Sequence, residues 1–318
     1  MGLGRWKLLR ALGAVAADPA AAADLGLPPA GTTGRDEVFT VNCPPYASLY
    51  AGDDQGRLAA FWAAAGLDPA AEPDHLAVLL DRYAGLGEAG EDGARRVLFG
   101  EFVWPWLPAY LGAVSDLPAG PLTRWAELTL DALRDEREQD RDWGLEPGGS
   151  LPWALCDAPP PVGLGGLGEL VEGLLTPLRS GMILTRRAVA AGAEQVGAGQ
   201  RIGNRRRALD AMLAAEPERA ARWLAGEADR WARRHASGQL GPSQDETSPD
   251  GASRDGSAGS DPVQLWWAER AAGTARLLSG IDALRGAGEA RDPGETHGTR
   301  GQEGVRGGQE TESVSVAD

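Results

Sequence analysis

The sequence predicts an all-α protein. Apolar residues recur at the three- and four-residue spacing of amphipathic helices along most of the chain. No alternating strand pattern of useful length and no internal repeat is visible, and proline- or glycine-rich stretches separate the periodic segments. We therefore expect a bundle of about ten helices in two helical parts joined by a hinge, with disordered C-terminal segments.

The stretch Glu72-Pro73-Asp74-His75 and the helix that it opens organise this prediction. Pro73 suits the first position of a helix, because its missing N–H needs no partner there. Asp74 would then lie in the first turn, where a carboxylate near the positive end of the helix dipole contributes roughly 0.3–1 kcal/mol. The apolar face of this helix comprises Leu76, Leu79, Leu80 and Tyr83.

The other elements of the first half follow from spacing and from proline. Apolar periodicity predicts helices over residues 5–17, 57–65 and 97–111, and a helix from Pro121 into the charged run 134–142. The third of these should kink or restart at Pro105, which removes a backbone hydrogen bond. Residues 37–41 fit a short extended segment or the end of a helix, and we favour the extended segment. We expect residues 44–50 to form a proline-stiffened turn that presents two tyrosines.

The second half repeats this helical pattern after a connector without periodicity at residues 143–161. Thr185 is a candidate N-cap for one of its helices. The expected helices cover residues 164–175, 186–196, 204–215, 217–235 and 263–284. In domain terms we expect a helical domain at 1–236 (halves about 1–142 and 162–236), a disordered insert at 237–261, a C-terminal helix at 262–286 and a disordered tail at 287–318.

The net charge of −15 argues against nucleic-acid binding and against binding to anionic membranes. The charge is unevenly distributed, since residues 36–157 hold 22 acidic and 8 basic residues, whereas residues 179–235 hold 12 arginines and 6 acidic residues. This contrast fits self-association or a cleft for a cationic peptide, and it equally fits two solvated helix faces.

Cysteine usage and hydropathy point to the cytoplasm. Cys43 and Cys156 form no metal-binding or redox spacing, and no apolar run approaches the roughly 18–20 residues of a membrane span. Arg10 interrupts the basic and apolar N-terminal segment, which therefore favours a short amphipathic helix over an export signal.

The chemistry of the sequence favours binding over catalysis. Asp74 and His75 are the one pair suited to acid–base work, but no nucleophile elbow, metal-binding histidine pair or phosphate loop accompanies them. The glycine-rich run 163–168 follows prolines and lacks a lysine, which indicates a helix-entry loop. Aromatic side chains near the prolines would suit a groove for an apolar helix or an extended peptide, although each could instead pack in the core: Tyr46, Tyr50, Trp62, Tyr83, Trp104 and Trp106.

Four segments in this order resemble the TorD/DmsD family of redox-enzyme maturation chaperones. They are Pro44-Pro45-Tyr46-Ala47-Ser48-Leu49-Tyr50, the helix with Trp62, Glu72-Pro73-Asp74-His75, and Phe102-Val103-Trp104-Pro105-Trp106. In the second half, residues 174–186 resemble a branch of the same family. The resemblance covers roughly residues 5–235 and the helix with Trp266 and Trp267. It departs from the family pattern where Pro73 directly precedes Asp74.

The resemblance implies a cytoplasmic, non-catalytic chaperone with a TorD-like helical fold. Such proteins bind the twin-arginine signal peptide, and often the apo-form, of the catalytic subunit of a molybdopterin oxidoreductase, and they delay its export until the cofactor is inserted. The resemblance allows a transient contact with the molybdopterin cofactor or a nucleotide, but no phosphate-cradling motif here supports one, and we expect no resident cofactor. The implied protein is a monomer or a homodimer. The family's signal-peptide-binding positions carry over to Pro45, Tyr46, Asp74 and His75, and less firmly to Trp62 and Trp106.

Two other functions remain open at this point. A non-catalytic helical assembly or scaffold protein for another partner would show the same composition. An enzyme that uses Asp74 and His75 would need further catalytic groups that the sequence does not reveal.

Overall fold

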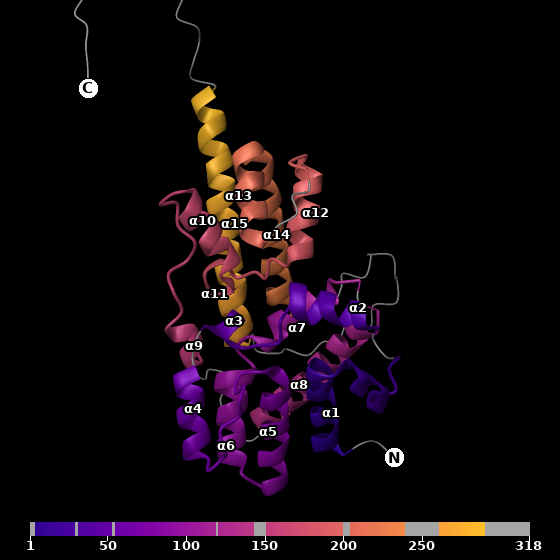
Figure 1. The fold of residues 1–318 in the computed structure, drawn as a ribbon. Coiled ribbons are helices and arrows are strands. Elements are labelled where there is room, and N and C mark those ends of the chain that lie inside the picture. The colour runs from indigo at the N-terminus through magenta and orange to yellow at the C-terminus, as the bar shows by residue number, and fades with distance from the viewer. Residues whose placement is uncertain are drawn as a thin grey trace, which may run out of the picture. The chain divides into compact units, whose positions relative to one another are not determined.

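The protein is seen in a computed structural model that describes residues 4–28, 31–52, 55–118, 120–142, 151–199, 204–238 and 261–289. Within these ranges every regular element is helical, and one isolated bridge pairs Tyr46 with His75. The all-α prediction is therefore confirmed. The chain divides into two compact units, Met1–Asp282 and Ala283–Asp318. The elements discussed below belong to the first unit, except for the end of the last helix, which extends beyond Asp282 (Figure 1).

The first half is built from short and medium helices. In chain order they are α1 (Arg5–Ala17), η1 (Pro19–Leu25), α2 (Thr32–Arg35), η2 (Asp36–Asn42), α3 (Ser48–Ala51), α4 (Gln55–Ala64), α5 (Leu76–Ala89), α6 (Asp92–Val97), η3 (Leu98–Val103), α7 (Leu107–Ser115) and α8 (Pro121–Asp142). This division is finer than the ten or so helices expected, because one-turn helices are too short to show a period in the sequence.

The second half contains the helices that the periodicity predicts, together with further one-turn elements. They are α9 (Trp153–Cys156), α10 (Leu167–Leu175), α11 (Pro177–Ser180), α12 (Arg186–Val196), α13 (Arg205–Ala215), α14 (Pro217–Ser237) and α15 (Pro262–Glu289). Figure 1 shows α12, α13 and α14 together beside α15. Thr185 caps α12 as predicted, since its side chain accepts a hydrogen bond from the amide of Ala188 at 3.0 Å.

Helix α1 lies close against α5. Gly13 permits this approach, because a Cβ at that position would lie 2.9 Å from the Cβ of Leu80. The indole of Trp125 on α8 donates to the carbonyl of Leu12 at 2.8 Å. A buried carboxylate, Glu136, accepts hydrogen bonds from Arg5 and from the hydroxyl of Tyr83. The core of the first half therefore joins α1, α5 and α8.

The break predicted at Pro105 is confirmed. The helical segment Asp92–Val103 ends in π-type geometry, and α7 begins at Leu107 after a bend of 52°. No single helix among the described residues is long and apolar enough to cross a membrane, although this bent pair meets the length and composition test. Residues 103–115 are buried within the protein.

The prediction that residues 37–41 are extended is wrong, since η2 is helical with π-type hydrogen bonds. The amide of Cys43 donates to the carbonyl of Val38 at 2.7 Å, and the side chain of Asn42 donates to the carbonyl of Glu37 at 2.8 Å. Val38 and Phe39 are adjacent and both buried, with Phe39 edge-on to Trp125. A strand would place these two neighbours on opposite faces, whereas a helix turns both toward the core.

Helix α15 contacts both halves. Two indole hydrogen bonds join its start to the break between η3 and α7. Trp104 donates to the carboxylate of Asp261 at 2.8 Å, and Trp267 donates to the carbonyl of Pro105 at 2.7 Å. Gly181, after α11, lies against the backbone of Ala271. Much of the predicted hinge, insert and tail, at residues 143–150, 239–260 and 290–318, lies outside the described residues.

Candidate functional site

Two segments that lie far apart in the sequence meet at the predicted site. The amide of Ala47 donates to the carbonyl of Asp74 at 3.0 Å, and the amide of Leu76 donates to the carbonyl of Pro45 at 2.9 Å. These two bonds flank the bridge between Tyr46 and His75. The structure thus brings together four of the six predicted site residues, which are Pro45, Tyr46, Asp74 and His75.

His75 is the N-cap of α5. Its Nδ1 atom accepts a hydrogen bond from the amide of Ala77 at 3.2 Å, and its backbone is extended. The prediction that Pro73 and Asp74 form the first turn of this helix is therefore wrong. The physical reason is the pairing of Asp74 and Leu76 with Ala47 and Pro45, which keeps His75 extended, so that the helix begins only at Leu76.

The Asp74 carboxylate serves a different helix from the one expected. Its Oδ2 atom accepts a hydrogen bond from the amide of Ser48 at 3.1 Å, at the start of α3. The residue is 6% exposed, and within the described ranges no basic side chain forms an ion pair with it. Asp74 is thus a buried carboxylate that one backbone amide satisfies only in part.

Tyr46 is the more accessible member of the group. Its hydroxyl donates to Glu72 at 3.0 Å, and its ring meets the His75 ring edge-on at 5.0 Å between centroids. Burial, and then the hydrogen bond to Glu72, raise the pKa of Tyr46. Burial lowers the pKa of His75 against the opposing effect of Glu72 and Asp74. A neutral His75 fits the acceptor role of Nδ1 and places the proton on Nε2.

Trp62 and Trp106 lie in the core, not on the surface of the site. Trp106 is fully buried, stacks on Tyr50 at 5.6 Å and donates to the carbonyl of Phe102 at 2.8 Å. Trp62 is 2% exposed, and its indole nitrogen has no hydrogen-bond partner among the described residues. In this conformation, a peptide on Tyr46 would not touch either tryptophan.

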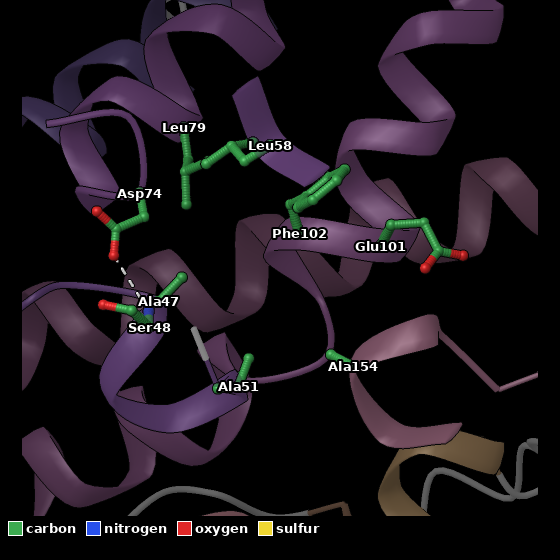
Figure 2. Close-up of a pocket in the computed structure, with 10 residues that line it drawn as sticks. Ala47, Ser48, Ala51, Leu58, Asp74, Leu79, Glu101, Phe102 and Ala154 are labelled. Carbon is green, nitrogen blue, oxygen red and sulfur yellow. Dashed lines mark hydrogen bonds between the residues drawn. The ribbon is translucent and has the colours of Figure 1, made fainter. Parts of the chain in front are cut away.

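A small pocket opens beside Asp74 (Figure 2). The room for the centre of a water-sized molecule is about 20 Å³, enough for about one water. Figure 2 shows Asp74 and Glu101 at opposite ends of the lining, with Leu58, Leu79 and Phe102 above the space. The lining residues are Ala47, Ser48, Ala51, Gly52, Leu58, Asp74, Leu79, Glu101, Phe102 and Ala154.

Sequence reasoning missed Glu101 and Ala154 as members of this pocket. Glu101 had a detectable signal, because it is the single charged residue in the otherwise apolar stretch 97–115. Ala154 had none, since it belongs to the one-turn helix α9 in the connector. Asp74 and Glu101 are the acidic residues of this mostly apolar lining, which contains no basic residue.

A larger cleft, of about 350 Å³, lies between the end of α7, α12 and α14. Its charges are paired within the protein. Arg230 binds Asp116 at 3.0 Å and Glu227 at 2.7 Å, and Arg187 approaches Glu37 at 3.7 Å. This cleft therefore shows no charge preference for a ligand.

The site lacks the arrangement of a catalytic centre. The Asp74 carboxylate bonds to the Ser48 amide, while His75 caps its own helix, so neither side chain positions the other for proton transfer. No group of three or more metal-binding side chains occurs in the part of the chain that the structure describes. The paired segments and the small pocket beside Asp74 make this a candidate binding site.

Comparison with known proteins finds one family and one relative that resemble part of this chain. Residues 36–111 match the family model described as "Nitrate reductase delta subunit". A stretch of 108 residues is 34% identical to "Chaperone protein YcdY" of Escherichia coli (strain K12), which covers 31% of this chain and 59% of that protein. The chain thus spans less than two thirds of the length of this curated relative. No solved structure matches the chain.

These matches confirm the predicted resemblance to the redox-enzyme maturation chaperones over this part of the chain. The matched segment 36–111 contains all six predicted site residues and Glu101. Similarity to a chaperone also supports the prediction that the protein is not an enzyme.

Proposed function

We propose that this protein is a cytoplasmic maturation chaperone for a molybdopterin oxidoreductase. It binds the twin-arginine signal peptide or the apo-form of the catalytic subunit, assists cofactor insertion and delays export until the enzyme is mature. It holds no cofactor of its own. The main support for this proposal is that the range matched by the family model, residues 36–111, contains both of the segments that pair at Tyr46 and His75, next to Asp74.

The chemistry of the site suits a twin-arginine leader. Such a peptide offers two guanidinium groups followed by an apolar segment, and guanidinium pairs well with carboxylates. Asp74 and Glu72 supply carboxylates beside Tyr46. The acidic excess of residues 36–157 would favour the encounter with a basic peptide.

Calorimetric titration of the full chain with the leader of the molybdoenzyme encoded nearest to its gene tests the proposal. We expect micromolar or tighter binding that weakens for a leader with both arginines replaced by lysine. Tyr46→Ala and Asp74→Ala should weaken binding without unfolding the protein. Glu91→Gln is the control, because Glu91 is an exposed acid outside the pocket.

Three results would count against parts of this proposal. Equal binding by the parent and both site variants would disprove the site. Binding to the mature apo-subunit but not to the leader would indicate a chaperone of cofactor insertion without control of export. Binding to neither would favour a helical scaffold for another partner.

A further inference from the structure

The pocket beside Asp74 has the chemistry of a receptor for one cationic side chain. Of its lining residues, Asp74 and Glu101 are the charged ones, and the others are small or apolar. Asp74 is more than nine-tenths buried and lacks an ion-pair partner within the described ranges. A buried carboxylate in apolar surroundings favours a ligand that brings a positive charge and an aliphatic stem.

The pocket is too small for such a ligand in the present conformation. Its room of about 20 Å³ holds about one water, and a guanidinium or ammonium group with its stem is larger. One wall therefore has to move before the ligand can enter.

Most walls of the pocket are firmly held. Leu58 on α4 and Leu79 on α5 are 3% and 0% exposed. Ala47 and Asp74 are joined by a backbone hydrogen bond. These parts cannot shift without disturbing the core of the first half.

Helix α9 is the weakly held wall. Its single turn carries Ala154 into the pocket lining and buries one side chain, Leu155. Trp153 is 61% exposed, and the guanidinium of Arg57 lies over its ring. Arg57 also forms an ion pair with Asp157, and the two side chains are 43% and 60% exposed. Exposed ion pairs of this kind contribute little to the free energy of folding.

Glu101 links α9 to the pocket. Its Oε2 atom accepts a hydrogen bond from the amide of Trp153 at 2.9 Å, and no basic side chain in the described residues forms an ion pair with it. The carboxylate that anchors α9 is thus also the second carboxylate of the pocket. A cation that binds Glu101 would share this carboxylate with the Trp153 amide and would therefore lie against α9.

We propose that the pocket between Asp74 and Glu101 receives the cationic head of a lysine or arginine side chain, and that α9 is the wall that moves to admit it. The proposal rests on the proposed function for the source of that side chain, a bound peptide. It adds Glu101 as a binding residue and α9 as a movable element.

A small probe tests the pocket independently of any peptide. Butylguanidinium carries the charge and the stem, and butylurea has nearly the same shape without the charge. We expect the backbone amide resonances of Ser48 and Trp153 in the full chain to shift on titration with butylguanidinium and not with butylurea. Absence of shifts, or equal shifts with both compounds, would overturn the proposal.

Glu101→Gln separates charge from anchoring. A glutamine keeps an oxygen that can accept from the Trp153 amide, so α9 should stay in place while the charge is lost. We expect about a tenfold or greater loss of affinity for butylguanidinium, as for loss of a charge-assisted hydrogen bond. Glu91→Gln should bind like the parent. An unchanged affinity in Glu101→Gln would show that Glu101 only anchors α9.

Hydrogen exchange tests the movement. The amides of Leu155, Cys156 and Asp157 are hydrogen-bonded within the turn, to the carbonyls of Pro152 and Trp153. Saturation with butylguanidinium should speed their exchange, while the amides of α5 stay protected. Unchanged exchange of α9 at saturation would disprove the moving wall.

The same variants distinguish this inference from the proposed function. If butylguanidinium binds but the twin-arginine leader does not, the pocket stands and the proposed function fails. If the leader binds the parent and Glu101→Gln with equal affinity, the function stands and the role of Glu101 fails.

Discussion

Replacing Gly181 by alanine would measure how firmly α15 is packed on the second half. Gly181 ends α11 with φ of 74°, in the left-handed region. A Cβ there would overlap the backbone of Ala271 on α15 and would lie 2.7 Å from its Cα atom. The carbonyl of Gly181 also accepts a hydrogen bond from Nε2 of His235 at 3.2 Å.

Gly197 provides a matched control. It ends α12 with φ of 81°, and a Cβ there would meet only the end of the Arg219 side chain, at 3.9 Å. Gly197→Ala should therefore cost the left-handed penalty alone, about 1–2 kcal/mol. Gly181→Ala should cost this amount plus about 1–3 kcal/mol for forcing backbone apart, as in an overpacked core.

Thermal and urea unfolding of the two variants give the comparison. For a body of this size, 1 kcal/mol corresponds to a shift in Tm of about 2–4 °C. Gly181→Ala should thus melt several degrees below Gly197→Ala, and limited proteolysis should cut α15 sooner. Equal destabilisation of the two variants would refute the close packing of α15 on Gly181.

Two further predictions concern buried ionisable groups. Burial lowers the pKa of His235 from 6.5 to about 4, so between these values the unfolded chain binds a proton that the folded chain does not. The free energy of unfolding should therefore fall as pH drops from 6.5 toward 4, by up to about 1.4 kcal/mol per pH unit. In urea unfolding of His235→Phe, the free energy of unfolding should depend less steeply on pH across this range. Glu136→Ala should cost about 3–5 kcal/mol in urea unfolding, because it removes the buried carboxylate that lies 3.6 Å from the Arg95 guanidinium and accepts a hydrogen bond from Tyr83, whereas the exposed Glu138→Ala should change stability by less than about 0.5 kcal/mol. Similar losses for the two glutamates would contradict this account.

Much of the fold follows from local rules. Thr185 satisfies the free amides at the start of α12, and Pro105 interrupts the helical hydrogen bonds between η3 and α7; both effects depend on neighbouring residues and are readable from sequence. Residues 37–41 were mispredicted because their β-branched and aromatic residues favour strands. The burial of adjacent Val38 and Phe39 against Trp125 overrides that preference.

The candidate site was predictable only in part. The grouping of Tyr46 with Asp74 and His75 followed from family resemblance, and the structure brings them together. The roles of His75 at the start of α5 and of Asp74 at the start of α3 could not be predicted, because they depend on backbone pairing between segments far apart in the chain. Trp62 and Trp106 could not be assigned to core or surface, because an aromatic on an amphipathic helix suits either place.

The location of α9 links the pocket to the rest of the chain. Directly after α9, the carbonyls of Pro159 and Pro160 accept hydrogen bonds from Arg270 on α15, at 3.0 Å, and from Arg179 on α11, at 3.1 Å. The connector is therefore held by the second half at one end and forms a pocket wall of the first half at the other. If ligand entry moves α9 and thereby loosens these two arginine contacts, then loosening the contacts should in turn strengthen ligand binding by the same coupling free energy. Under the proposed function, capture of a basic side chain would thus be coupled to the contacts of the connector with α11 and α15.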